Sequence, residues 1–275
     1  MSTADVRRRA LATAVIASGV LALTGCSSAS PADATGTPSA VPSAVPSATP
    51  FDGIPAVGAL IRDGDHFCTA SVVDSPRGNV LATAAHCVYT PEEEAEDGDE
   101  PGYIPGRLEF APRSSGTGPG AYPYGKWKVT GIHVGDLWKR DNEDQGDYAF
   151  LTVEPNEDGR TVQEVVGAAV PDFSSGFRRH VTVIGYPNED HNPDNRPVRC
   201  STTTRRDDDE PYMLRIDCAG LWSGTSGSPW LADHHDPHRP GRLIGVLSGG
   251  DTDTESVAVR FDERAREVYE RAVRG

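Results

Sequence analysis

The sequence predicts an all-β fold with one α-helix at its C-terminal end. Short apolar or alternating stretches recur along most of the chain, and Gly, Pro, Asp and Asn interrupt them. Such stretches are typical of short strands joined by turns. The 275 residues include 29 Gly and 22 Pro, so much of the chain lies in turns and loops. Hydrophobic residues make up 37% of the sequence, which is enough for a packed core.

The expected strands pack as a sandwich or as a pair of barrels. They cover residues 56–61, 67–73, 80–85, 127–134, 148–153, 181–186, 212–218, 243–248 and 256–261. Residues 261–273 differ from these stretches. There Phe261, Ala265, Val268, Tyr269 and Ala272 recur at helical spacing with charged residues between them. We therefore expect an amphipathic helix in this segment.

The N-terminal residues 1–25 have the pattern of an export signal. Three arginines at positions 7–9 precede an apolar stretch over residues 10–23, which is too short for a stable membrane span. The stretch ends in Leu-Thr-Gly-Cys26, which resembles a bacterial lipobox. The resemblance implies removal of residues 1–25 and a lipid on Cys26. The alternative is an ordinary secretory signal, in which Cys26 has no special role.

Residues 26–50 are predicted to form a disordered linker. Ser, Ala, Pro and Thr dominate the segment, and Ala-Val-Pro-Ser occurs in it twice. It lacks the apolar surface needed to fold, and its prolines favour extended conformations. Through a lipid on Cys26 the linker would hold a folded domain, residues 51–275, at a membrane outside the cytoplasm; without the lipid the domain would be secreted.

The charge balance limits the possible partners. The formal net charge is −15, which argues against a general nucleic-acid binder because such a protein needs a basic surface. Acidic residues gather at 92–100 and 207–210. Neither segment matches an EF-hand, so we interpret both as solvated loops rather than calcium sites. We expect a monomer without a metal or cofactor.

Three short motifs contain the candidate catalytic residues. His86 lies in TAAHC (83–87), Asp147 in GDYAFL (146–151) and Ser226 in GTSGSP (224–229). A serine hydroxyl needs an adjacent base before it can act as a nucleophile, and an imidazole can take and return its proton. A carboxylate on the second ring nitrogen fixes the tautomer. Asp144 is an alternative to Asp147, but no apolar stretch follows it directly.

These motifs, in the order His…Asp…Ser, resemble those of the chymotrypsin-like (trypsin-fold) serine proteases, in particular the secreted bacterial members. The resemblance runs from about residue 51 to the end of the chain. It implies two packed antiparallel six-stranded β-barrels, about 51–160 and 161–275, with the site between them. The implied activity is serine endopeptidase action on polypeptides. His86 would be the base, Asp147 its orienting group and Ser226 the nucleophile.

Further site residues follow from the same resemblance. The N–H groups of Gly224 and Ser226 would form the oxyanion hole, and Ser248, Gly249 and Gly250 would belong to a substrate-binding strand. Gly220 stands where trypsin-type members carry a specificity-determining Asp at the base of the pocket. The family pairs the positions of Cys68 and Cys87. Four cysteines allow three connectivities, and the preferred set is Cys68–Cys87 with Cys200–Cys218.

Two departures from the family matter. Thr225 replaces the Asp that precedes the nucleophile in digestive members, and no Ile-Val-Gly-Gly start is present, so activation by a new N-terminus is not expected. Leu247 falls where glutamyl endopeptidases of this fold carry a His. With Gly220, this leaves a pocket for a neutral side chain as the default. The acidic stretch between residues 91 and 105 follows the His86 motif and would disfavour acidic substrates if it lies near the cleft.

The sequence admits three other interpretations. An α/β-hydrolase esterase needs a G-x-S-x-G elbow and the order Ser…Asp…His, and neither is present. The run His-His-Asp-Pro-His at 234–238 suggests a metal site, but a solvated loop is the better interpretation. A catalytically silent, protease-like binding or scaffold lipoprotein remains the serious alternative. Such proteins usually lack a member of the triad, whereas all three candidate residues are present here.

Overall fold

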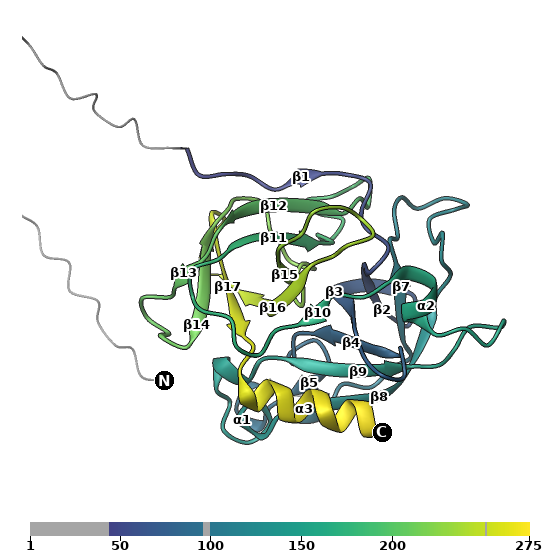
Figure 1. Cartoon of the computed structure of the whole chain (residues 1–275), viewed down its shortest axis with the longest axis horizontal. Helices are drawn as coiled ribbons and strands as arrows, with labels where there is room; N and C mark the ends of the chain where they lie inside the picture. The colour runs from purple at the N-terminus through teal and green to yellow at the C-terminus, as the bar shows by residue number, and fades with distance from the viewer. Residues whose placement is uncertain (1–43, 96–99, 251) are drawn as a thin grey trace, which may run out of the picture. The chain divides into compact units, whose positions relative to one another are not determined.

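The computed structural model describes residues 44–95, 100–250 and 252–275. The predicted export signal and Cys26 therefore lie outside the described residues. Strands are the commonest regular element of the structure, and one sheet closes into an antiparallel six-stranded barrel (Figure 1). Around this first barrel the strands are β2 (Val57–Arg62), β3 (Asp65–Val73), β4 (Val80–Thr83), β9 (Ala149–Val153), β8 (Trp127–Val134) and β7 (Leu108–Pro112).

A second sheet curls into a half-barrel. Its order is β1 (Thr49–Pro50), β12 (Val198–Thr203), β11 (His180–Gly185), β15 (Pro229–Ala232), β16 (Arg242–Gly249), β17 (Glu255–Arg260), β14 (Met213–Asp217) and β13 (Arg205–Arg206), with β10 (Val170–Pro171) parallel to β16. No backbone pairing joins β12 to β14 in the described part of the chain. The Cys200–Cys218 disulfide connects β12 to the end of β14, so it bridges the open side of the half-barrel.

Short elements fill the connections between strands. Strands β5 (Tyr89–Thr90) and β6 (Gly102–Tyr103) pair with each other. Two short helices are α1 (Asp136–Lys139) and α2 (Val162–Val166), and two 3₁₀ turns cover Glu92–Glu94 and Asp144–Gly146. Among the described residues, no helix is long and apolar enough to cross a membrane.

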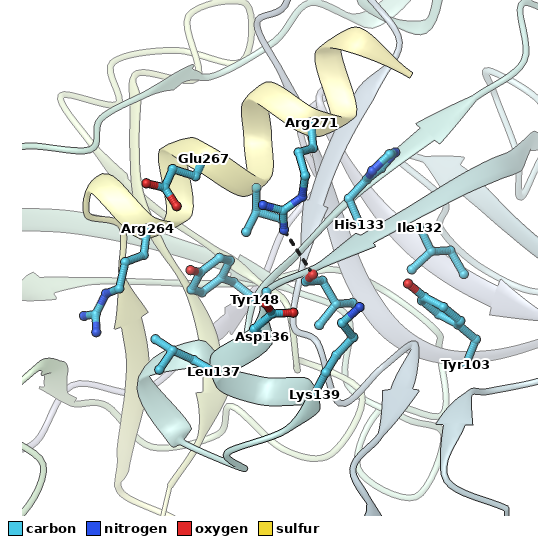
Figure 2. Close-up of a pocket in the computed structure, with 13 residues that line it drawn as sticks. Tyr103, Ile132, His133, Asp136, Leu137, Lys139, Tyr148, Arg264, Glu267 and Arg271 are labelled. Atoms are coloured by element: carbon cyan, nitrogen blue, oxygen red, sulfur yellow. Dashed lines mark hydrogen bonds between the residues drawn. The ribbon is translucent and has the colours of Figure 1, made fainter.

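Helix α3 (Glu263–Arg274) follows the last strand of the half-barrel and packs against β8 and β9 of the first barrel (Figure 1). The Asp262 carboxylate caps its N-terminus by accepting hydrogen bonds from two backbone N–H groups. Its buried residues Ala265, Val268 and Ala272 lie on one face. Near its other end, Arg271 donates to the carbonyl of Val134 at 3.2 Å (Figure 2). The helix therefore ties the two sheets together.

An aromatic cluster lies under α3. It contains Tyr148, Phe150, Phe173, Phe261 and Tyr269, whose contacting rings have centroids 5.5–6.4 Å apart. Phe150 belongs to the first barrel, whereas Phe261 directly follows the last strand of the half-barrel. The rings belong to a buried cluster with residues from both sheets. This shared core therefore fixes the position of one sheet relative to the other, and with it the positions of the loops between them.

The structure confirms the predicted fold class and the C-terminal helix. Each predicted strand is found within two residues of its expected bounds. Apart from the two-residue strands, β7, β12 and β15 were not predicted. Glu109 interrupts the apolar residues of β7, Arg199 interrupts those of β12, and β15 is a short run that begins with Pro229. The prediction of a linker up to residue 50 was too long: Ala48, Thr49 and Pro50 pair with the half-barrel.

Candidate active site

His86 lies in a turn directly after β4, at the end of the first barrel. Ala84 and Ala85 before it are fully buried, and the disulfide between Cys87 and Cys68 of β3 fixes the turn from the other side. The Trp138 ring of α1 lies beside the imidazole, with ring centroids 6.5 Å apart. The backbone of His86 is therefore held while 31% of its side chain stays exposed.

Asp147 is buried and accepts hydrogen bonds from three groups. The His86 backbone N–H donates to Oδ1 at 2.8 Å, and the His86 Nδ1 lies 2.7 Å from Oδ2. The hydroxyl of Ser248, from β16 of the half-barrel, donates to Oδ2 at 2.6 Å. Asp147 thus meets donors from both sheets. The alternative acid, Asp144, makes no hydrogen bond to His86.

The electrostatics of the pair follow from this geometry. Burial disfavours both charged forms, but mutual attraction and the hydrogen bonds outweigh it in each case. The pKa of His86 is therefore raised above its ordinary value of 6.5, chiefly through the charge and hydrogen bond of Asp147. The pKa of Asp147 is lowered below 3.8 by His86 and Ser248. Asp147 stays ionised near neutral pH and favours a proton on the imidazole.

The loop that carries Ser226 is attached to both sheets. The Ser226 carbonyl accepts from the Thr69 N–H at 2.8 Å, and the Thr69 hydroxyl donates to the Gly224 carbonyl at 3.0 Å. On the other side, the Gly227 N–H donates to the Leu247 carbonyl of β16 at 2.8 Å. Because Thr69 follows Cys68, the same stretch of β3 holds the turn of His86 and the loop of Ser226.

Gly227 shows how closely the loop packs against the first barrel. A Cβ at this position would lie 2.2 Å from the Thr83 Oγ1 and 2.3 Å from the Thr69 carbonyl oxygen. Its φ of +81° also lies in the region that favours glycine. Thr83 is three residues before His86. Gly227 therefore allows the Ser226 loop to lie directly on the chain that leads to His86.

Two backbone donors lie on the same turn as Ser226. In the described residues, neither the Gly224 N–H nor the Ser226 N–H donates a hydrogen bond. The carbonyl of Ser223 accepts from the Asn188 N–H at 2.8 Å. Since the peptide is trans, the Gly224 N–H points away from Asn188. Both N–H groups therefore remain available for an oxyanion, as the resemblance implies.

His86 and Ser226 share no hydrogen bond in the described structure. Nδ1 faces Asp147, so Nε2 is the nitrogen left to meet a hydroxyl. No bond between Nε2 and the Ser226 hydroxyl is found among the described side chains. In substrate-free enzymes such pairs are often long and shorten when substrate binds.

A cavity of about 270 Å³ opens beside Ser226. Leu221 and Trp222 line it, opposite Leu247 and the predicted substrate-binding residues Gly249 and Gly250. Ser248 does not line the cavity, because its side chain faces Asp147. Gly220 does not line it either. The Gly220 N–H donates to the carbonyl of Asp253, which does line the cavity.

Two acidic residues of this cavity were missed in the sequence. Asp253 and Glu255 both line it, and they come from the acidic run that follows Gly250. Glu255 is paired with Arg215 of β14, which also lies 3.5 Å from Asp207. The acidic run itself was the available signal. The pairing of β17 with β16 brings these residues to the cavity, and the sequence does not give the position of that pair relative to Ser226.

The metal-site interpretations were tested against the positions of the ligand atoms. In the described residues, the one group of three candidate ligands within 4.8 Å of one another is Cys68, His86 and Cys87. Both sulfurs belong to a disulfide and therefore cannot bind a metal as thiolates. The histidines at 234–238 do not form such a group, and His234 contacts the carbonyl of Pro240.

A second cavity, of about 460 Å³, lies between α3 and the turn that connects β8 to α1 (Figure 2). Lys139, Arg264 and Arg271 line it together with Asp136 and Glu267. Figure 2 shows these side chains coming from the two helices on opposite sides of the cavity. None of the three candidate catalytic residues lines it, although Tyr148, which follows Asp147, does.

Comparisons with known proteins bear on the family and the fold of the chain. The trypsin family model matches residues 47–266. No curated protein matches the sequence. Among solved structures, the protease Anisep from Arthrobacter nicotinovorans is similar to this chain, with a TM-score of 0.71 and 21% identity over 83% of this chain and 100% of that one.

Two further structures are similar in fold. A thermostable serine protease, AL20, from an extremophilic microorganism has a TM-score of 0.67 and 23% identity over 80% of this chain and 97% of its own. A Glu endopeptidase in complex with MPD has a TM-score of 0.65 and 16% identity over 84% of this chain and 98% of its own. At these identities the similarity concerns the fold.

Proposed function

Because the chain belongs to the trypsin family, we propose that it is a serine endopeptidase that acts through His86, Asp147 and Ser226. The observation that carries the proposal is the hydrogen bonding of Asp147. This buried carboxylate orients the His86 ring through Nδ1, and donors from both sheets fix the carboxylate itself. An arrangement of this kind supplies the base that a serine nucleophile requires.

The reaction follows from these positions. The Ser226 hydroxyl attacks the substrate carbonyl while His86 Nε2 takes its proton, and Asp147 stabilises the resulting imidazolium. The N–H groups of Gly224 and Ser226 stabilise the oxyanion. His86 then gives the proton to the leaving amine, which yields an acyl-enzyme. A water molecule, deprotonated by His86, hydrolyses the ester and restores Ser226.

Labelling with a fluorophosphonate tests this proposal. We expect the probe to react with the native chain and to modify Ser226, as located by mass spectrometry of the proteolytic fragments. A heat-denatured sample should not react, because a serine without its base is a weak nucleophile. A correctly folded chain that does not react would favour the alternative function, a catalytically silent binding or scaffold protein.

The acid limb of the pH profile is a second expected result. Only neutral His86 can accept the Ser226 proton, so kcat/KM should fall tenfold per pH unit below the His86 pKa. Because that pKa is raised, the midpoint of the limb should lie above pH 6.5. The measurement uses a neutral peptide substrate from pH 5 to 8. A flat profile over this range would exclude His86 as the base.

The substrate pocket leads to a prediction about the residue before the cleaved bond, termed P1. Asp253 and Glu255 line the cavity. Of these two residues, Glu255 forms an ion pair with Arg215, whereas Asp253 forms none in the described structure. We expect basic P1 side chains to exceed acidic ones in kcat/KM by at least about tenfold, which corresponds to 1.4 kcal/mol. This differs from the neutral pocket that the sequence suggested. A cleavage profile over a peptide library measures the preference.

Substitution of the pocket carboxylate provides the control for this prediction. Asp253→Asn should reduce the basic preference, whereas Asp158→Asn on an exposed loop of the first barrel should leave it unchanged. Both variants should still react with the fluorophosphonate. A library profile dominated by acidic P1 residues would contradict the prediction.

We also propose that the enzyme works as a monomer outside the cytoplasm, anchored to the membrane by a lipid on Cys26. The support is the sequence pattern of residues 1–26. Radioactive palmitate should label the chain in a host that processes lipoproteins, and Cys26→Ala should remove the label. A mature chain that begins after Cys26 would contradict the anchor.

A further inference from the structure

The segment Pro46–Pro50, here called the strap, lies alongside the half-barrel although the sequence predicts a linker. The Ala48 N–H donates to the Ala219 carbonyl at 2.7 Å, and the Ala219 N–H donates to the Pro46 carbonyl at 2.8 Å. Farther on, Thr49 and Pro50 pair with β12 (Figure 1). The strap therefore satisfies both backbone groups of Ala219.

Ala219 belongs to the segment that leads from β14 to Ser226. On its side away from the strap, the Cys218 N–H donates to the Thr254 carbonyl at 2.9 Å and the Gly220 N–H to the Asp253 carbonyl at 3.3 Å. Residues 218–220 thus lie between the strap and the turn after β16, as a central strand lies between two neighbours. The strap is the outer of these two supports.

The supported segment continues into the wall of the substrate cavity, because Leu221 and Trp222 line that cavity. Ala48 and Leu221 pack against the same buried cluster of the half-barrel. A Cβ on Gly220 would lie 3.6 Å from the Ala48 Cβ, so the strap also closely backs this residue. Side-chain packing and hydrogen bonding therefore both connect the strap to the wall.

We propose that the strap is a positioning element that holds the Leu221–Trp222 wall in place to receive the P1 side chain. The inference rests on the proposed peptidase function. Without the two hydrogen bonds to Ala219, the segment 218–220 is held on one side only, by the bonds of Cys218 and Gly220, and the wall gains freedom that substrate binding must remove. The strap lies outside the triad and the oxyanion hole. Its loss should weaken binding of large P1 side chains while the reactivity of Ser226 persists.

Two proline substitutions in the full chain test this role. Ala48→Pro removes the N–H that bonds to Ala219, whereas the Ser47 N–H donates no hydrogen bond in the described structure, so Ser47→Pro is the matched control. We expect Ala48→Pro to raise KM about five- to tenfold for a peptide with a large P1 side chain, the scale of losing one or two hydrogen bonds. Ser47→Pro should stay within about twofold of the wild type.

A peptide with alanine at P1 and the fluorophosphonate separate the possible outcomes. For both, Ala48→Pro should resemble the wild type, because neither depends on the wall. An equal loss for small and large P1 side chains, or equal behaviour of Ala48→Pro and Ser47→Pro, would overturn the positioning role. If the wild-type chain does not react with the fluorophosphonate, it is the peptidase proposal that fails.

Discussion

Replacing Ser226 with alanine is expected to lower kcat for a peptide substrate by about a millionfold, the scale seen when a serine nucleophile is removed. The substitution removes only the hydroxyl. The Ser226 carbonyl keeps its hydrogen bond from Thr69, so the loop should retain its position. We therefore expect an unchanged melting temperature together with the loss of activity. Stopped and continuous assays of peptide hydrolysis give the rate, and thermal unfolding gives the stability.

Ser115→Ala is a suitable control, because this half-buried serine lies in a loop of the first barrel and its side chain makes no hydrogen bond in the described structure. Its kcat should equal that of the wild type. Residual activity above a thousandth of the wild-type rate in Ser226→Ala would mean that another group performs the nucleophilic attack. Fluorophosphonate labelling at a different residue would identify that group.

Replacing Asp147 with asparagine is expected to lower kcat by about ten-thousandfold, as loss of the orienting carboxylate does in triads of this kind. The amide can donate its own hydrogen to Nδ1, which leaves the proton on Nε2. In that tautomer the imidazole cannot accept the Ser226 proton. The variant also loses the charge that raises the pKa of His86. The acid limb of the pH profile should therefore move to lower pH.

Asp144→Asn is the matched control for this prediction. It removes a carboxylate three residues away that makes no hydrogen bond to His86, and it should leave kcat within about twofold of the wild type, as expected away from the catalytic contacts. In the wild type, burial and the charges of Asp147 and Glu143 raise the pKa of the Asp144 carboxyl. A large loss in Asp144→Asn with an active Asp147→Asn would reverse the assignment of the two residues.

Local sequence motifs predicted the three residues of the candidate triad. The contacts that bring these residues together could not be predicted from the sequence. His86, Asp147 and Ser226 each lie in a short run whose residue types are distinctive. Thr69 gives no such signal, yet it bonds to the Ser226 loop 157 residues later in the chain. Such contacts depend on how the two sheets pack together. Periodicity within one strand carries no information about that packing.

The substrate pocket and the strap were not predicted, because they also depend on contacts between distant parts of the chain. No sequence motif assigns Asp253 and Glu255 to a pocket, and the pairing of β17 with β16 brings them to the cavity. The strap has the composition of a disordered linker, because Pro, Ser and Ala dominate it. It is ordered through backbone hydrogen bonds to Ala219, and these depend little on side-chain type. Composition therefore misplaced the boundary of the folded domain.

The hydrogen bond from Ser248 to Asp147 has a consequence for the cell that makes this enzyme. Asp147 and His86 belong to the first barrel, whereas Ser226 and Ser248 belong to the half-barrel. A chain that is still being synthesised has made the base and its carboxylate long before the nucleophile. Under the proposed mechanism, a chain that is incomplete or still unfolded contains no working site. The host's own proteins are thereby spared until the finished chain folds.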